Sequence, residues 1–262
     1  MQILQLPSDI AADLESRNLQ ILTADSVDGF LTKADEVSVP SWPEFMLHDH
    51  VSDKYWAAMT RKHAEFQFCL VDKQSKRWVA VGNSIPIHWT GSFDELPDDG
   101  WDWALESGME IEIHNMVSAI AIQIHPEFRG QKLSALMIKI MRAIAANHGY
   151  KYLVAPVRPN HKHLYPKMPI EEYVAWRKDG LPVDPWLRVH ERLGAKIIKI
   201  CPKAMLISGS VREWEKWTGL KFPQSGEYVV EGALVPVNVD VEEDIGAYVE
   251  PNVWMVHETN AK

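Results

Sequence analysis

One segment in the middle of the chain limits the fold more than any other. Residues 116–124 form an apolar run of strand length that ends at His125-Pro126, and residues 150–155 resume strand character. Between them, apolar residues recur at the spacing of one helix face, and Gly149 marks the helix end. Strand, helix and strand within roughly forty residues predict a parallel βαβ unit with a right-handed crossover. The helix-face residues are Leu133, Leu136, Met137, Ile140, Met141 and Ile144.

The segments around this unit predict a single α/β domain with an extension. Residues 66–71 and 78–82 read as a β-hairpin. A short helix is expected over residues 186–193, followed by a pair of strands, 195–200 and 204–207. We therefore expect a twisted mixed sheet with helices on both faces over residues 1–207. Residues 208–262 change to turns rich in aromatic residues, and we expect a C-terminal extension that packs on the domain or on the partner in a homodimer.

Composition excludes several classes of protein. The chain has 27 Lys and Arg against 36 Asp and Glu, a net charge of −9, which argues against a nucleic-acid binder. Only Cys69 and Cys201 occur, without a CxxC pair, so neither a disulfide framework nor a cysteine zinc site is expected. The N-terminus lacks a basic region before an apolar run, and no stretch reaches the ~20 apolar residues of a membrane span. We expect a soluble, cytoplasmic protein.

The junction between the first strand and the helix of the βαβ unit carries the clearest chemical signal. A strand that turns sharply into a helix presents backbone N–H groups without internal partners, at the positive end of the helix dipole. Arg129 and Gly130 stand at this turn, so it is suited to bind phosphate oxygens. The alternative is an ordinary strand-to-helix loop with a solvated arginine.

The residues of this junction resemble a known family. Ile122-Gln-Ile-His-Pro-Glu-Phe-Arg-Gly130 resembles motif A of the GCN5-related N-acetyltransferase (GNAT) superfamily, and Leu187-Arg-Val-His-Glu-Arg-Leu-Gly-Ala195 is similar to the end of its motif B. The resemblance covers roughly residues 66–207. Lys132 stands where the family prefers glycine and Ser134 where it prefers glycine or alanine. We expect that neither position needs a left-handed backbone. We also expect the side chain of Lys132 to crowd or contact the pyrophosphate.

The resemblance implies a GNAT fold that binds acyl-CoA where two central parallel strands separate. It implies that pantetheine bonds to the strand backbone, that the pyrophosphate lies on the loop and helix N-terminus, and that an Asn after the second strand contacts the cofactor arm. In this sequence the strand positions are Ile122, Gln123 and Ile124, the loop and helix positions are Arg129, Gly130, Gln131, Lys132, Leu133 and Ser134, and the Asn is Asn160.

The resemblance also implies two catalytic roles. His190 occupies the position of the family's tyrosine, which protonates the departing thiolate, and the ordinary pKa of histidine leaves some acid form available. The alternative is a histidine on a helix surface near its C-terminus. Family members use a carboxylate ahead of the central strand as the base. Glu112 is the first candidate and Glu110 the second, because residues 109–114 alternate as a strand; the alternative is an exposed strand face.

These observations predict an acyl-CoA-dependent N-acyltransferase, with acetyl-CoA as the default donor. It would transfer the acyl group directly to an amine of a small molecule or a peptide. One alternative is a GNAT-like protein that binds acyl-CoA without N-acetyl transfer. Another is a metal-assisted hydrolase built on the pairs His48/His50 and His161/His163, but neither pair has a third ligand at a recognisable spacing, so we expect no metal.

Overall fold

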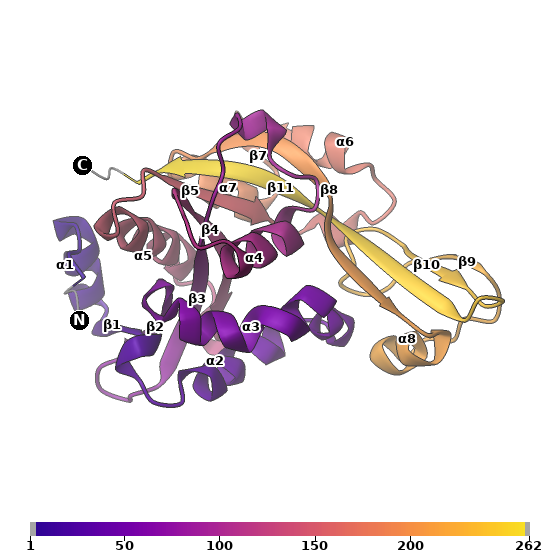
Figure 1. The fold of residues 1–262 in the computed structure, drawn as a ribbon, viewed down its shortest axis with the longest axis horizontal. Helices are drawn as coiled ribbons and strands as arrows, with labels where there is room; N and C mark the ends of the chain where they lie inside the picture. Colours follow the sequence, from indigo (N-terminus) through magenta and orange to yellow (C-terminus); the bar gives the residue numbers. More distant parts are fainter. Residues whose placement is uncertain (1–3, 260–262) are drawn as a thin grey trace.

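The computed structural model describes residues 4–259, which form an α/β structure around one large mixed sheet (Figure 1). The strand order is β1-β2-β3-β4-β5-β11-β10-β9, and β8 pairs with the other edge of β11. All pairings in this sheet are antiparallel except that of β4 with β5. The strands are β1 (Leu19–Thr23), β2 (Gln67–Asp72), β3 (Trp78–Ile87), β4 (Met116–Ile124), β5 (Tyr152–Val157), β8 (Lys196–Gly209), β9 (Gly226–Tyr228), β10 (Val237–Asp240) and β11 (Ile245–Glu258), with β6 (Arg177–Lys178) and β7 (Leu181–Pro182) in a separate hairpin.

Helices cover both faces of the sheet, as expected from the sequence. One face packs against α1, α5 and α7, and the other against α2, α3 and α4. Two successive residues of β5 point to opposite faces of the sheet: Leu153 packs with α5, and Val154 packs with α3 and α4. The helices are α1 (Ser8–Ser16), α2 (Phe30–Ser38), α3 (His50–Lys62), α4 (Gly100–Glu110), α5 (Leu133–Asn147), α6 (Ile170–Ala175), α7 (Pro185–Arg192) and α8 (Val211–Thr218).

The predicted βαβ unit is confirmed. It consists of β4, α5 and β5, and the apolar stripe of α5 is buried against β2, β3 and β4. The two parallel strands pair only briefly, with Val117 opposite Leu153 and Ser118 opposite Val154. Both strands then continue toward their C-terminal ends without further pairing to each other, so the sheet opens there.

Residues 195–207 differ from the expected strand pair. They lie in one long strand, β8, whose antiparallel partner is β11 near the C-terminus. β11 also pairs with β5, from Val253 opposite Val157 to Glu258 opposite Tyr152. The tail therefore contributes a strand to the middle of the sheet rather than an extension packed on it, and the expected division between residues 207 and 208 falls inside β8. Pro202, which lies between the two expected strands, is accommodated at an irregularity in the pairing of β8 with β11.

β8 and β11 continue beyond the main body into an arm that carries α8, β9 and β10 (Figure 1). Trp214 of α8 is fully buried over Gly246, where an added Cβ would lie 2.3 Å from the indole ring. Tyr248 and Trp254 of β11 are also fully buried within the chain. The large aromatic side chains that suggested a homodimer are thus largely buried within the chain itself.

The expected strand over residues 109–114 is wrong. Residues up to Glu110 belong to α4, and residues 111–115 form a loop before β4. The alternating acidic and apolar residues lie where the end of α4 meets the loop, and they do not pair with any strand of the sheet. No helix among residues 4–259 is long and apolar enough to cross a bilayer.

Candidate functional site

The site begins where β4 and β5 separate. β4 carries a β-bulge at this level, because Ser84 of β3 lies opposite Ala119 while Asn83 lies opposite Ala121, which leaves Ile120 without a partner on β3. The carbonyl of Ile120 instead accepts a hydrogen bond from Trp101 Nε1 of α4, at 2.9 Å. The backbone of β4 beyond the bulge, including Ile122, Gln123 and Ile124, therefore borders an opening next to β5. This is the position that the sequence predicted for the pantetheine arm.

The loop between β4 and α5 provides an open turn. Gly130 has φ +80° and Lys132, the N-cap residue of α5, has φ +59°, so both adopt the left-handed region. The expectation that Lys132 needs no left-handed backbone is wrong, because its φ lies in the region that glycine adopts without strain. Lys132 makes no side-chain capping hydrogen bond, which leaves the first N–H groups of α5 available. A Cβ added at Gly130 would meet nothing within 4 Å, so the turn is open to a ligand.

Neighbouring segments hold this loop in place. Arg17, which follows α1, donates from Nη1 to the carbonyl of Gln131 at 2.9 Å. Arg129 Nη2 donates to Ser41 Oγ at 3.2 Å. Arg129 and Lys132 place two positive charges around the N-terminus of α5, in a chain with a net charge of −9, whereas Arg17 is paired with Asp13 at 2.6 Å. The charge and the free N–H groups together fit a pyrophosphate.

The left-handed backbone at Lys132 leads to a stability prediction. Lys132→Gly is expected to raise the melting temperature by about 2–4 °C, since a side chain in this region costs about 1 kcal/mol. Lys132→Ala keeps the backbone strain and serves as the control, so it should not gain stability. Both variants lose the charge and should weaken CoA binding by about 3- to 10-fold. Thermal unfolding and calorimetry measure the two effects; equal stability of the glycine and alanine variants would contradict the assigned strain.

His190 lies in the interior and not on a helix surface. It is 3% exposed on α7, and its Nδ1 lies 2.9 Å from Nε2 of His257 on β11. Burial, and then the neighbouring His257, hold the pKa of His190 well below its ordinary value. The expectation that His190 keeps an acid form available near neutral pH is therefore wrong. His257 was not identified from the sequence, although a histidine that alternates with Val253 and Met255 was a usable signal.

The two predicted bases lie near the surface. The carboxylate of Glu112 is 84% exposed and lies 3.3 Å from Lys62 Nζ. The carboxylate of Glu110 is 59% exposed and accepts from the hydroxyl of Tyr55, which with Lys54 lowers the pKa of Glu110. Both residues precede β4, whereas the two parallel strands separate near its middle. The structure does not bring either carboxylate to the opening.

Two other carboxyl groups, of Asp49 and Asp102, lie close together on the face of α3 and α4. Asp49 is fully buried at the N-terminus of α3, where its Oδ1 accepts from Ser52 N at 2.8 Å. Asp102 lies in the first turn of α4, next to Trp101, and its Oδ2 accepts from Leu206 N at 3.1 Å. Burial raises the pKa of both groups, and the charge of Asp49 raises that of Asp102 further. The pair therefore holds a proton more strongly than ordinary carboxyl groups do.

Asn160 follows β5 in an exposed position, and its carbonyl lies 2.8 Å from His163 Nδ1. The segment after it is fixed to α7, because Asp184 Oδ2 accepts from His161 N and from the hydroxyl of Tyr173, each at 2.9 Å. Asn160 thus lies on the same side of the sheet opening as the C-terminal end of β5. Within residues 4–259 no three His, Cys, Asp or Glu side chains gather as metal ligands.

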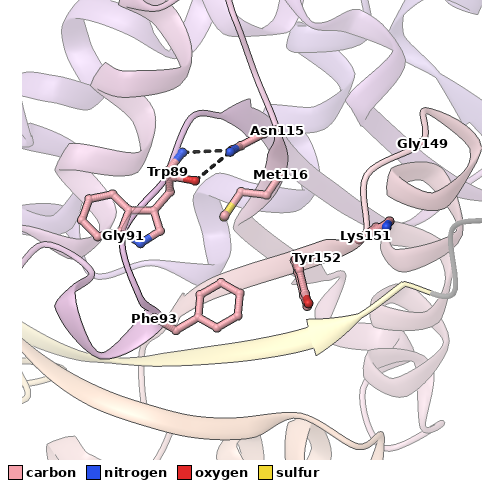
Figure 2. A pocket seen from close by; sticks show the side chains of 8 residues that line it. All are labelled: Trp89, Gly91, Phe93, Asn115, Met116, Gly149, Lys151 and Tyr152. Atoms are coloured by element: carbon pink, nitrogen blue, oxygen red, sulfur yellow. Dashed lines mark hydrogen bonds between the residues drawn. The ribbon is translucent and has the colours of Figure 1, made fainter.

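A cavity of about 390 Å³ lies at the other end of the parallel strands (Figure 2). Met116 and Tyr152, which begin β4 and β5, contribute to its wall, so it is separate from the opening at their C-terminal ends. Asn115 closes one side through two hydrogen bonds with the backbone of Trp89, of 2.9 and 2.7 Å (Figure 2). This cavity does not belong to the site formed by β4, α5 and β5.

Within residues 4–259, the one parallel strand pair of the mixed sheet separates beside a helix with a free, positively charged N-terminus, an arrangement that suits an acyl-CoA-dependent acyltransferase. No family model matches the sequence. The chain is 34% identical over 247 residues to an arginine N-acetyltransferase of Aspergillus versicolor, covering 82% of this chain and 84% of that protein. The chain belongs to the GCN5-related N-acetyltransferase superfamily, and it is an acyl-CoA-dependent N-acyltransferase.

Solved structures agree on the fold. The loading GNAT-like domain of CurA from Lyngbya majuscula superposes with a TM-score of 0.59 at 20% identity, over 94% of this chain and 98% of that chain. The GphF GNAT-like decarboxylase, solved with isobutyryl-CoA, gives a TM-score of 0.59 at 15% identity, over 92% of this chain and 100% of that chain.

Proposed function

We propose that this enzyme transfers an acetyl group from acetyl-CoA to arginine or to a small molecule with an arginine-like cationic amine. The choice of acceptor is supported by the similarity to the arginine N-acetyltransferase over most of both chains. The bound thioester would supply an activated acyl group. The backbone of Ile122–Ile124, the turn at Gly130 and Lys132, and Asn160 would bind and orient the donor, because these groups border the opening and its phosphate-binding turn.

In this proposal the acidic pair of Asp49 and Asp102 takes the place of Glu112 and Glu110 as proton acceptor for the amine. Trp101 links the start of α4 to the bulge of β4, so Asp102 lies one residue from a side chain that contacts the opened strand. A carboxyl group with a raised pKa is suited to accept a proton near neutral pH. The negative pair also suits a cationic acceptor. The donor and the acceptor would then approach from opposite faces of the sheet.

The setting of the reaction is also part of the proposal. Cys69 and Cys201 are free and buried, and burial raises the pKa of each thiol to about 12. Unpaired, unreactive thiols are typical of proteins from reducing compartments. We therefore propose that the protein acts in the cytoplasm.

Two measurements test the proposal. Calorimetry should show micromolar binding of acetyl-CoA that depends on the pantetheine arm, with free ADP as the comparison. Mass spectrometry should then show acetylated L-arginine after incubation with acetyl-CoA, and L-citrulline, which lacks the cationic group, should not react. Binding of acetyl-CoA with acetylation of other amines but not arginine would overturn the acceptor. Absence of binding would overturn the donor.

A further inference from the structure

The pair of His190 and His257 joins two segments that are distant in sequence, and it is enclosed. The two imidazole rings are 3% and 1% exposed, and one hydrogen bond of 2.9 Å joins His190 Nδ1 to His257 Nε2. The outer nitrogen of each ring, His190 Nε2 and His257 Nδ1, has no hydrogen-bond partner within residues 4–259. A buried polar atom without a hydrogen-bond partner lowers the stability of the fold. A functional role would explain why these two atoms are nevertheless present.

The strand pairing places the pair next to the opening. His257 lies opposite Leu153 of β5, and Leu153 in turn lies opposite Val117 of β4, in the short parallel stretch after which the strands separate. Neighbouring strands are about 4.8 Å apart, so His257 is one strand away from the point of separation. Val253 and Met255 share its side of β11 and pack against α7 with Ala119 of β4. His190 of α7, which bonds to His257, therefore lies on this same face of the sheet, beside the short parallel stretch at whose end β4 and β5 separate.

The surroundings keep both rings neutral. Burial lowers the pKa of His257 to about 4, with the guanidinium of Arg142 adding to the effect. Arg142 reaches the pair from α5 and is itself fixed to the carbonyls of Leu193 and Glu258. Burial and His257 together lower the pKa of His190. A single proton therefore lies between His190 Nδ1 and His257 Nε2. If His257 Nε2 carries this proton, His190 is protonated at Nε2; if His190 Nδ1 carries it, His190 Nε2 is unprotonated.

We propose that His257 is a positioning residue, which donates from Nε2 to His190 Nδ1 and so holds His190 as a neutral imidazole with its Nε2–H directed at the sulfur of CoA. The inference rests on the proposed transfer reaction. In that reaction the amine nitrogen forms the C–N bond, the C–S bond breaks, and its electron pair stays on sulfur. The amine loses one proton to the acidic pair, and the sulfur takes one from solvent. His190 gives a hydrogen bond and loses no proton, since a neutral imidazole can stabilise developing negative charge as a donor.

The first test uses the wild-type protein without turnover. Isotope-edited nitrogen NMR should show a protonated Nε2 and an unprotonated Nδ1 for His190 in the free protein. CoA should then shift the Nε2 signal of His190, whereas desulfo-CoA, which lacks the sulfur, should bind and leave that signal unchanged. Equal shifts with the two ligands, or an Nδ1-protonated His190 in both complexes, would overturn the inference.

The second test separates positioning from packing with two variants of matched size. In His257→Gln the side-chain amide can still donate to His190 Nδ1, whereas in His257→Met the donor is lost. We expect His257→Met to lower kcat by about 10- to 100-fold at an unchanged KM for acetyl-CoA, and His257→Gln to stay within about 3-fold of wild type. Equal loss in both variants would reduce His257 to a structural role. Melting temperatures of both variants show whether they are folded.

The outcomes also distinguish this inference from the proposed function. If arginine is not acetylated but CoA still shifts His190 Nε2 selectively, the acceptor is wrong and the placement of the histidine pair holds. If arginine is acetylated and the two variants of His257 behave alike, the function holds and the role of His257 is wrong.

Discussion

Arg129→Glu is expected to weaken the binding of acetyl-CoA by about 30- to 100-fold, which corresponds to roughly 2–3 kcal/mol. The guanidinium of Arg129 lies on the loop before α5 and donates to Ser41 Oγ, so its charge is held at the free N-terminus of this helix. A carboxylate at the same position would repel the pyrophosphate and oppose the favourable effect of the helix dipole. Calorimetric titration with acetyl-CoA measures the change.

The control for this prediction is Arg212→Glu. Arg212 is exposed on α8 in the arm, and its reversal changes the net charge of the protein by the same amount. Its effect on affinity should stay within about 2-fold, because solvent and salt screen charges over such separations. Equal loss in both variants would show that overall charge, and not the loop, determines binding. Adenosine alone, which lacks the pyrophosphate, should bind the two variants alike.

Asp102→Asn is expected to lower kcat by about 100-fold or more while it stabilises the folded protein at pH 8. Asparagine keeps an oxygen that can accept from Leu206 N, and its amide can donate to the carboxylate of Asp49. It cannot accept the proton of the amine, and general-base catalysis contributes 10²- to 10⁴-fold. The rising limb of the pH–rate profile should therefore disappear, and kcat measured from pH 6 to pH 9 tests this.

The stability change has the opposite sign, because burial disfavours the charged form of Asp102. A carboxyl group whose pKa is raised by folding binds more protons in the folded state than in the unfolded one. Its stabilising effect is complete below the ordinary pKa of about 4 and is lost as the pH rises through the raised pKa. Wild-type stability should thus fall between pH 5 and pH 8, and this fall should be smaller in the variant, which gains about 1–2 kcal/mol at pH 8.

Glu106→Gln provides a matched control on the same helix. Glu106 lies one turn after Asp102 in α4 and contributes to the raised pKa of Asp102 only through its charge. The kcat of Glu106→Gln should remain within about 3-fold of that of the wild type. If Asp102→Asn retains both the activity and the pH dependence of the wild type, the acidic pair is not the proton acceptor.

The sequence sufficed for those parts of the fold in which a local pattern determines the structure. The apolar stripe of α5 and the strand formers of β4 and β5 predicted these three elements, and the motif at residues 122–130 located the open turn where we propose that phosphate binds. Partners distant in sequence were not accessible in this way. No local pattern shows that β11 enters between β5 and β8, or that His257 meets His190.

The acidic residues illustrate a further limit. Glu110 and Glu112 alternate with apolar residues and imitate a strand, but helix α4 ends among them. Asp49 and Asp102 look like ordinary acidic residues at helix N-termini, Asp49 as the N-cap of α3 and Asp102 in the first turn of α4, where they favour the helix dipole. Only the packing of α3 against α4 and β8 buries Asp49, brings Asp102 next to it in a half-buried position and shifts their pKa values. Burial is a property of the assembled fold, and composition does not reveal it.

The position of β11 has a consequence for biosynthesis. A ribosome releases the chain from its N-terminus onward, so β11 emerges after β5 and β8. Until then β5 and β8 lack their common neighbour, and both present unpaired edges. The turn before α5, where we propose that the pyrophosphate binds, is synthesised long before His257 of β11, the partner of His190. The sheet is thus complete only once β11 has been synthesised, and a chain that stops before Ile245 lacks the strand that joins β5 to β8.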